Sequence, residues 1–376
     1  MNRRAFLRSG VSAALALAGC RRSRFVDQFP GGLPESGCAL PPVRVRPERE
    51  IRTVAGLRPY RPSGFVVRPE RIGDQLVIHN YGHGGGGITL SWGTARLAVE
   101  MVPPDARGPV AVLGCGAVGL ATARLLQETG RPVTIYAKDL PPNTTSNIAG
   151  GQWFPFLVFD SVRRTPEFFR QFVAASDFAY RRYQTMAGPR YGIRWMRNFA
   201  VGNEPWREQG LLGRESPFRA MLPNFRDLSP SEHPFQGYRY VRQFDGMLIE
   251  PPIYLEAMLD EVRAAGAAVR VTELAGSETL AALPERIVLN CTGLGSRALF
   301  GDEELVPVKG QLTFLLPQPE IGYAVLNGEN YMFPRSDGIL LGGTHETGVW
   351  SLEPDPAARE RVLARHREFF DSFRSC

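Results

Sequence analysis

The sequence has few cysteines and histidines, five of each among 376 residues, and none of the cysteines forms a CxxC pair. Zinc and iron–sulfur sites need such ligands at short, regular spacing, so no metal centre is predicted. His79 and His83 invite a metal interpretation, but they stand in a glycine-rich stretch with no third ligand in view. Cys115 and Cys291 lie in apolar segments, and we expect them to be buried thiols.

Long apolar runs and blocks of one charge are also missing after the first twenty residues. No later stretch is apolar for the length that a membrane-spanning helix needs. Three arginines, Arg3, Arg4 and Arg8, precede Cys20 with no acidic residue among them, so removal of that leader takes the net charge from +6 to +3. Because the remaining charges of both signs are interspersed, the sequence does not predict a nucleic-acid partner.

The N-terminus predicts export. Residues 2–8 form a twin-arginine pattern, residues 11–18 are apolar, and Leu-Ala-Gly-Cys at 17–20 is typical of a bacterial lipobox, whose Cys20 would carry the lipid anchor. We therefore expect a folded, periplasm-facing lipoprotein, with residues 1–20 as signal and 21–40 as linker. A chance basic and apolar leader is the alternative, and it would leave the protein cytoplasmic. In an oxidising compartment Cys38 and Cys376 could pair, which the sequence leaves open.

A nucleotide-binding unit begins at residue 109. A buried strand over 110–113 leads into a glycine turn and a helix that extends to residue 128, and a second strand covers 132–137. Gly114 permits the turn, Gly116 lets the backbone approach a pyrophosphate, and Gly119 lets the helix pack on the strand. This βαβ start predicts a parallel, doubly wound sheet.

The same unit supplies further cofactor contacts. Ala117 and Val118 lie at the helix start, where unpaired N–H groups and the positive dipole end face the phosphates. Asp139 follows the second strand, where an acid usually holds the ribose hydroxyls, and Lys138 stands beside it. A dinucleotide is the predicted ligand.

Two further segments favour a flavin over a nicotinamide. Residues 144–153 carry hydroxyls that can reach phosphate oxygens and glycines that allow close approach to a flat ring. Residues 79–89 include four consecutive glycines that lead into a helix, whose start would face the pyrimidine end of the flavin. The predicted contacts in the two segments are Thr144, Thr145, Ser146, Gly150, Gly151, Gln152, Gly84, Gly87, Ile88 and Thr89.

These segments, with the GLRPYRP run at 56–62 and residues 290–293, resemble signatures of the D-amino-acid oxidase family. The resemblance covers most of the chain after about residue 41. The order differs, because the family's nucleotide turn opens the protein and its Arg-Pro and HNYGHGG segments close it. Here these two segments come first and are joined to the turn by residues 103–108. We interpret the order as a circular permutation, with a shuffled gene as the alternative.

The resemblance implies roles for three residues at the substrate. Arg58 would hold the substrate carboxylate by two parallel charge-assisted bonds, Tyr331 would contact the same carboxylate, and the Gly85 carbonyl would accept a hydrogen bond from the amine. The family often has a second pocket tyrosine, on a lid, four positions before Tyr331, and here that position is Asn327. With Asn327 there, we expect a more open pocket and faster product release.

The predicted fold class is α/β, with a Rossmann-like FAD-binding domain on a parallel sheet and an α+β substrate domain on a mixed or antiparallel sheet. The FAD-binding domain takes residues 59–155 and 254–297, and the substrate domain takes residues 41–58, 156–253 and 298–376. Whether the chain forms a homodimer stays open.

The predicted reaction is oxidative deamination of a D-amino acid by hydride transfer to flavin N5, with O2 as acceptor and no acid–base side chain required. Because the amine must be neutral when the hydride leaves, the rate should rise with pH. Three alternatives remain: a glycine or secondary-amine oxidase, a quinone-linked dehydrogenase, and an exported flavin-binding lipoprotein without turnover.

Overall fold

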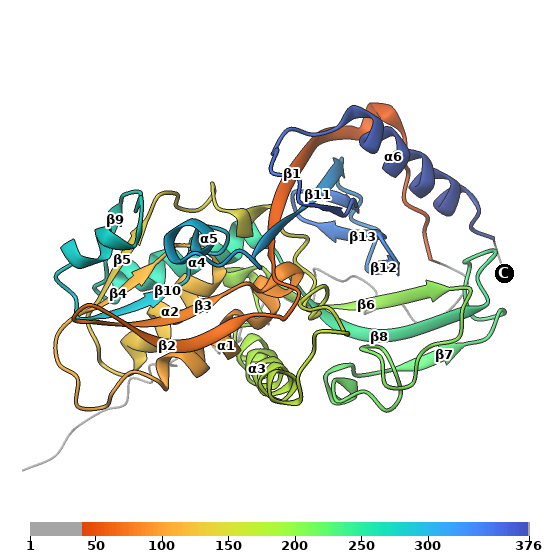
Figure 1. Cartoon of the computed structure of the whole chain (residues 1–376). Coiled ribbons are helices and arrows are strands. Elements are labelled where there is room, and N and C mark those ends of the chain that lie inside the picture. Colours follow the sequence, from red (N-terminus) through yellow and green to blue (C-terminus); the bar gives the residue numbers. More distant parts are fainter. Residues whose placement is uncertain (1–39, 375–376) are drawn as a thin grey trace, which may run out of the picture.

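Two β-sheets organise residues 40–374, the part of the chain that the computed structural model describes (Figure 1). The sheets lie in two lobes, and strand β1 crosses from one lobe to the other. The predicted leader, Cys20, Cys38 and Cys376 lie outside the described residues. Among residues 40–374, no helix combines the length and the apolarity needed to span a bilayer.

The first sheet is the predicted nucleotide-binding sheet. Its order is β2-β3-β10-β4-β5-β9, and all neighbours run parallel except the β2–β3 hairpin. Every residue of β4 and of β10 is buried, because helices or loops cover both faces of a parallel sheet. Its strands are β2 (Val66–Ile72), β3 (Gln75–Tyr81), β4 (Val110–Leu113), β5 (Val133–Ala137), β9 (Ala268–Val271) and β10 (Ile287–Asn290).

The helices follow the predicted positions closely, with two additions, α3 and the short α5. We did not predict a helix in the segment that forms α3, which we assigned to the substrate domain, yet its buried residues recur at helical spacing. The helix packs on α1 and buries Phe168 and Phe172 in an apolar core that includes residues of both sheets. The Thr165 hydroxyl accepts the Phe168 N–H at 3.1 Å and caps the helix. The helices are α1 (Gly87–Val99), α2 (Ala117–Glu128), α3 (Pro166–Thr185), α4 (Pro251–Ala264), α5 (Gly295–Phe300) and α6 (Pro356–Asp371).

The second sheet is mixed and largely antiparallel, as predicted. Its order is β1-β11-β14-β13-β12-β6-β8-β7, with β15 paired to β11, and only β12 and β6 run parallel. Its strands are β1 (Glu50–Tyr60), β6 (Ile193–Gly202), β7 (Arg226–Leu228), β8 (Tyr240–Ile249), β11 (Val306–Leu315), β12 (Tyr323–Asn327), β13 (Asn330–Arg335), β14 (Gly338–Gly342) and β15 (Glu346–Thr347).

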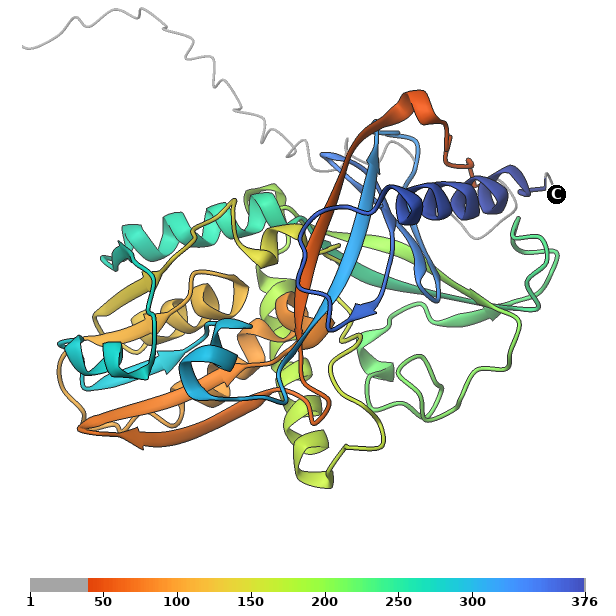
Figure 2. The same ribbon diagram turned by 45° about the horizontal axis from the view of Figure 1, so that its top comes forward.

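The two faces of the second sheet have different roles. Helix α6 covers one face (Figure 2). Its residues Val362, Leu363 and Phe370 belong there to the same apolar cluster as Val325 and Met332. The other face buries Phe314 and Phe333 together with Ile148, a residue that follows the first βαβ unit in the sequence. This second face therefore meets the nucleotide-binding lobe.

Short 3-10 turns place the loops between these elements. They are η1 (Pro47–Arg49), η2 (Gly84–Gly86), η3 (Thr145–Ile148), η4 (Pro189–Tyr191), η5 (Arg219–Met221) and η6 (Ser277–Ala282). Two of them, η2 and η3, contact β1, which brings both predicted flavin segments to the same strand.

Candidate active site

The glycine turn between β4 and α2 has the geometry that a pyrophosphate needs. Gly114 has φ +100°, and a Cβ there would lie 2.5 Å from the Cys291 carbonyl oxygen. A Cβ at Gly119 would overlap the Gly114 carbonyl oxygen. Gly116 caps α2 without a side-chain hydrogen bond, so the cap residue itself satisfies none of the N–H groups in the first turn of the helix.

The predicted hydroxyl segment lies directly against this turn. Ser146 Oγ accepts the Ala117 N–H at 3.1 Å, and a Cβ at Gly116 would stand 3.0 Å from that oxygen. Thr144 donates to Asn147 Oδ1 at 2.7 Å. Asn147 is 8% exposed, and its Nδ2 finds no partner within residues 40–374. The segment thus presents an unsatisfied buried donor beside the phosphate-binding turn.

The remaining predicted contacts on this side are more peripheral. Lys138 and Asp139 follow β5 and are exposed, and Lys138 Nζ lies 3.9 Å from Glu273 Oε1. Thr145 is exposed as well. Gln152 donates through Nε2 to Asn198 Oδ1 at 2.6 Å, so its amide ties the segment to the second sheet.

The glycine run at the start of α1 is the second predicted flavin-binding segment. Gly84 has φ +55°, and the Gly85 N–H donates to the Leu157 carbonyl at 2.9 Å. Helix α1 begins at Gly87, and Ile88 is its second residue. Its N-cap, Gly86, supplies no side-chain hydrogen bond. Its Thr89 hydroxyl exchanges hydrogen bonds with the Phe154 main chain, at 3.1 and 3.3 Å. The glycine run is therefore hydrogen-bonded to the stretch of chain that directly follows the other predicted flavin segment.

Strand β1 places Arg58 between these two segments. Successive residues on one face of a strand are two apart, so the Gly56, Arg58 and Tyr60 positions share a face. A Cβ at Gly56 would lie 2.8 Å from Cγ2 of Ile148, at the end of η3. A Cβ at Gly84, in η2, would lie 3.1 Å from Cδ2 of Tyr60, the last residue of β1. Arg58 stands between these contacts.

Arg58 is half-buried and has no carboxylate partner within residues 40–374. Its one hydrogen bond there runs from Nη1 to the Thr344 carbonyl at 3.3 Å. Arginines that lose water usually gain an acidic partner. The site therefore holds a positive charge that is ready for an anion.

Tyr331 reaches the same region from β13. Its ring stacks on Phe333 with centroids 5.0 Å apart, and a Cβ at Gly150 would lie 3.7 Å from Tyr331 Cε2. A Cβ at Gly343 would lie 3.0 Å from the Tyr331 hydroxyl. Because Gly343 adjoins Thr344, the tyrosine hydroxyl and the arginine fork approach the same short segment.

The lid interpretation of Asn327 is wrong. Strands β12 and β13 form a tight hairpin in which Asn327 pairs with Asn330 and Leu326 pairs with Tyr331. Asn327 donates to the Tyr238 hydroxyl at 2.7 Å, on the face that α6 covers. Since neighbouring strand residues face opposite ways, Leu326 is the side chain that shares the face of Tyr331.

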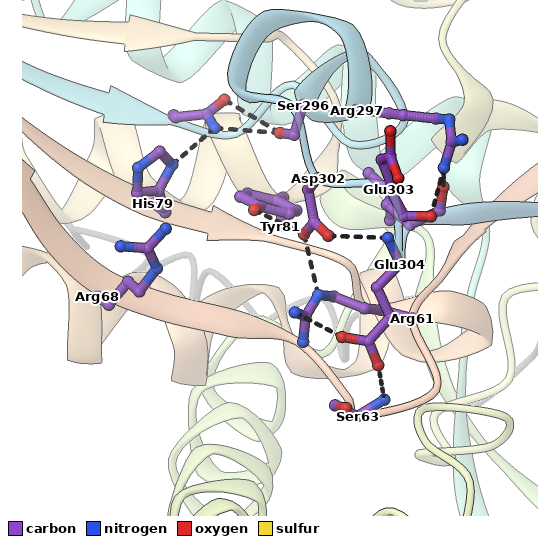
Figure 3. Close-up of polar contacts among 12 residues, drawn as sticks. Arg61, Ser63, Arg68, His79, Tyr81, Ser296, Arg297, Asp302, Glu303 and Glu304 are labelled. Atoms are coloured by element: carbon purple, nitrogen blue, oxygen red, sulfur yellow. Dashed lines mark hydrogen bonds and ion pairs between the residues drawn. The ribbon is translucent and has the colours of Figure 1, made fainter. Parts of the chain in front are cut away.

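The second arginine of the GLRPYRP run does not enter the site. Arg61 Nε lies 2.9 Å from Asp302 and its Nη2 lies 2.6 Å from Glu304, while the Tyr81 hydroxyl donates to Asp302 at 2.8 Å (Figure 3). Burial would raise the pKa of Asp302, but the hydrogen bond from Tyr81 and the charge of Arg61 hold that pKa below its ordinary value. This network joins β1, β3 and the loop after α5.

The histidines and cysteines singled out in the sequence have structural contacts. His79 contacts Glu70 at 3.1 Å and Asn290 at 3.1 Å, and His83 contacts the Thr94 hydroxyl at 2.9 Å. Burial lowers the pKa of His83 to about 3. Cys115 and Cys291 are free and buried as predicted, and burial raises the pKa of each thiol to about 12.

Sequence reasoning missed several residues of the site. Asn147 lies inside a segment that was already singled out, so its neighbours gave a signal for it. Leu326 and Thr344 had none, because their place depends on strand register and on the turn after β14.

The fold and the site together define a nucleotide-dependent oxidoreductase, and comparison with known proteins gives the family. A family model described as DAO, FAD dependent oxidoreductase, matches residues 33–101 and 109–375. The chain therefore belongs to the DAO family of FAD-dependent oxidoreductases. The unsatisfied Asn147 amide and the uncapped glycine starts of α1 and α2 fit FAD, which the residues around them would hold.

Named relatives and solved structures agree with this family. The chain is 34% identical to the D-amino-acid oxidase of Rubrobacter xylanophilus over 266 residues, 68% of this chain and 74% of that protein. It is 32% identical to the D-amino-acid oxidase of Streptomyces coelicolor over 267 residues, 69% and 76% of the two chains. The fold matches glycine oxidase from Bacillus cereus with a TM-score of 0.54 at 17% identity, over 69% of this chain and 77% of that one. The protein is thus a flavoenzyme with an amino acid oxidase-like function.

Proposed function

We propose that this protein oxidises D-amino acids to 2-oxo acids and ammonia, with the consumption of O2 and water and the release of H2O2. The observation that carries the proposal is Arg58, a half-buried guanidinium without an acidic partner in the described chain, set between the two flavin-binding segments. The D-amino-acid oxidases among its relatives support the stereochemistry. Bound FAD would supply the redox chemistry, as the acceptor for the hydride of the substrate Cα and the donor of electrons to O2.

The chain's own residues bind and orient the substrate. The Arg58 fork binds both carboxylate oxygens, and the Tyr331 hydroxyl donates to one of them. The Gly85 carbonyl accepts a hydrogen bond from the amine. These three contacts fix the direction of the Cα–H bond, which is the condition that hydride transfer needs. The substrate amine has to be neutral at that moment, so the rate rises with pH.

A panel assay tests this proposal. Purified holoenzyme is mixed with paired D- and L-amino acids and with glycine, and peroxide is measured together with bleaching of the flavin absorbance under argon. We expect peroxide and bleaching from D-amino acids. Turnover of glycine or sarcosine alone would make the protein a glycine or secondary-amine oxidase. Bleaching without peroxide would point to a dehydrogenase with another acceptor, and no bleaching with any compound would leave a flavin-binding lipoprotein.

We also propose that the protein is exported by the twin-arginine route and anchored through Cys20. The arginine pair and the lipobox support this, and export of a folded chain suits an enzyme that binds FAD before it crosses the membrane. Cys20→Ala should move the protein from the membrane fraction to the soluble periplasmic fraction. Recovery of the wild type entirely in the cytosol would contradict the proposal.

A third proposal is that the chain is a circular permutant of its family. The family match breaks at residues 102–108, and the β2–β3 hairpin, which precedes the nucleotide unit in the chain, completes the same sheet beside β10. Leu40 and Phe373 pack in one apolar cluster, so the two ends can be rejoined. A chain that begins at residue 109 and continues from 374 through a short linker to 40–101 should bind FAD. Failure of this chain to fold would contradict the proposal.

A further inference from the structure

The two proposed carboxylate ligands come from strands that are not neighbours. The strand order in the second sheet is β1-β11-β14-β13, so Arg58 and Tyr331 stand on the two outer strands of this group. Strands in a sheet lie about 4.8 Å apart, so two strands between them leave a gap of roughly 14 Å between the outer backbones. Their side chains can meet only by lying across β11 and β14.

Gly310 is the residue of β11 that Arg58 crosses. Gly56 pairs with Gly310 and Arg58 pairs with Val308, so the arginine reaches diagonally over the glycine. A Cβ at Gly310 would lie 2.5 Å from Arg58 Cζ and closer still to both terminal nitrogens. The site thus needs this space and not an unusual backbone conformation, because Gly310 is absent from the glycines with positive φ.

Gly342 has the same relation to Tyr331. The two residues are direct partners in the β13–β14 register. A Cβ at Gly342 would lie 2.7 Å from Tyr331 Cδ2 and closer still to Cε2 and Cζ. The phenol ring therefore lies flat on β14, with its hydroxyl directed toward Gly343 and Thr344.

We propose that Gly310 and Gly342 are positioning residues that form a floor for the carboxylate clamp. Each lacks a side chain where Arg58 or Tyr331 must lie flat, and together they let the two groups converge on one face of the sheet, Arg58 from β1 and Tyr331 from β13. The inference rests on the proposed function, because it assumes that the clamp holds a substrate carboxylate. A side chain at Gly310 would displace Arg58, and a side chain at Gly342 would displace Tyr331.

The first test is Gly310→Ala in the FAD-loaded protein. The guanidinium is the free end of a flexible side chain, so the methyl group displaces it while the fold is kept. A displacement near 1 Å can cost about 100-fold in catalysis. We expect the Kd of benzoate, a carboxylate without an amine, to rise about 100-fold in a titration of the flavin absorbance. FAD content should be unchanged. Gly202→Ala in β6 is the matched control, because its Cβ would meet only Trp206 at 3.8 Å.

A double-mutant cycle separates positioning from general damage. In the Gly310→Ala background, Arg58→Lys should add little to the loss of benzoate affinity. The displaced guanidinium of Arg58 already fails to bind both carboxylate oxygens. Additive effects would show that Gly310 acts through something other than Arg58. Gly342→Ala and Tyr331→Phe form a second double-mutant cycle. This cycle tests the proposal if Gly310→Ala does not fold.

The outcomes distinguish this inference from the proposed function. If the wild type oxidises D-amino acids and Gly310→Ala and Gly342→Ala bind benzoate as tightly as the wild type, the floor is wrong and the function stands. If the wild type oxidises no amino acid while both variants lose benzoate, the proposed function is wrong and the floor stands.

Discussion

Removal of the Arg58 charge should abolish most of the activity while the flavin stays bound. Arg58 is the one half-buried group at the junction of β1, η2 and η3 whose charge has no acidic partner among residues 40–374. Loss of one member of a desolvated charge pair costs about 2–5 kcal/mol. At 1.4 kcal/mol per tenfold change, this corresponds to a decrease in kcat/KM of about 30- to 4,000-fold.

The two substitutions at this position should differ in kind. Arg58→Ala removes both binding and orientation, so KM rises and kcat falls. Arg58→Lys restores a point charge without the planar fork, so KM should recover in part while kcat stays low. Steady-state peroxide assays give both constants, and the flavin absorbance gives the cofactor content of each variant.

A control arginine lies on the same strand. Arg52 is exposed and pairs with Asp337 at 2.6 Å, away from the glycine segments, so Arg52→Ala should keep wild-type kinetics. If Arg58→Ala binds FAD and still oxidises D-amino acids at a rate near that of the wild type, the carboxylate is not held by this residue. A secondary-amine oxidase would then be the better interpretation.

Three further predictions follow from the described contacts. Asn327→Tyr should leave the product off-rate unchanged in stopped-flow traces, whereas Leu326→Tyr should lower it, because only Leu326 shares the face of the site; the opposite result would restore the lid interpretation. Asp302→Asn should lower the free energy of unfolding by about 1–3 kcal/mol, because Arg61 loses one of its two carboxylate partners and keeps only Glu304; chemical denaturation measures this, and an unchanged midpoint would contradict it. His83 has a pKa of about 3 in the folded protein and an ordinary pKa near 6.5 in the unfolded chain. At pH 5 the unfolded chain therefore binds a proton on His83 that the folded protein does not bind. The free energy of unfolding at pH 5 should thus be about 2 kcal/mol lower than above pH 7. His83→Asn should remove that part of the pH dependence in denaturation curves recorded at both pH values, and an equal acid loss in the variant would assign it to other groups.

The sequence alone was sufficient to predict those elements whose signal lies within one contiguous segment. The turn at Gly114, Gly116 and Gly119 needs three glycines at fixed spacing between a strand and a helix, so residues 110–137 could be predicted from their order. Helix α4 and strand β10 were found in the same way, by periodicity and by a short buried run. The predicted flavin segments at 79–89 and 144–153 could be proposed from the sequence because each is contiguous.

Contacts between distant segments depended on the tertiary structure. Helix α3 buries residues at helical spacing along one face, but only the tertiary structure shows that α3 packs on α1. A spacing of four residues suggested Asn327 for the lid, but strand register has a period of two, so the hairpin turns Asn327 toward α6 and presents Leu326 instead. The approach of Arg58 to Tyr331 across Gly310 and Gly342 follows from the order β1-β11-β14-β13, which brings together residues far apart in the chain. Strand order is set by how the apolar faces of all the strands pack together, and no single segment of sequence contains that information.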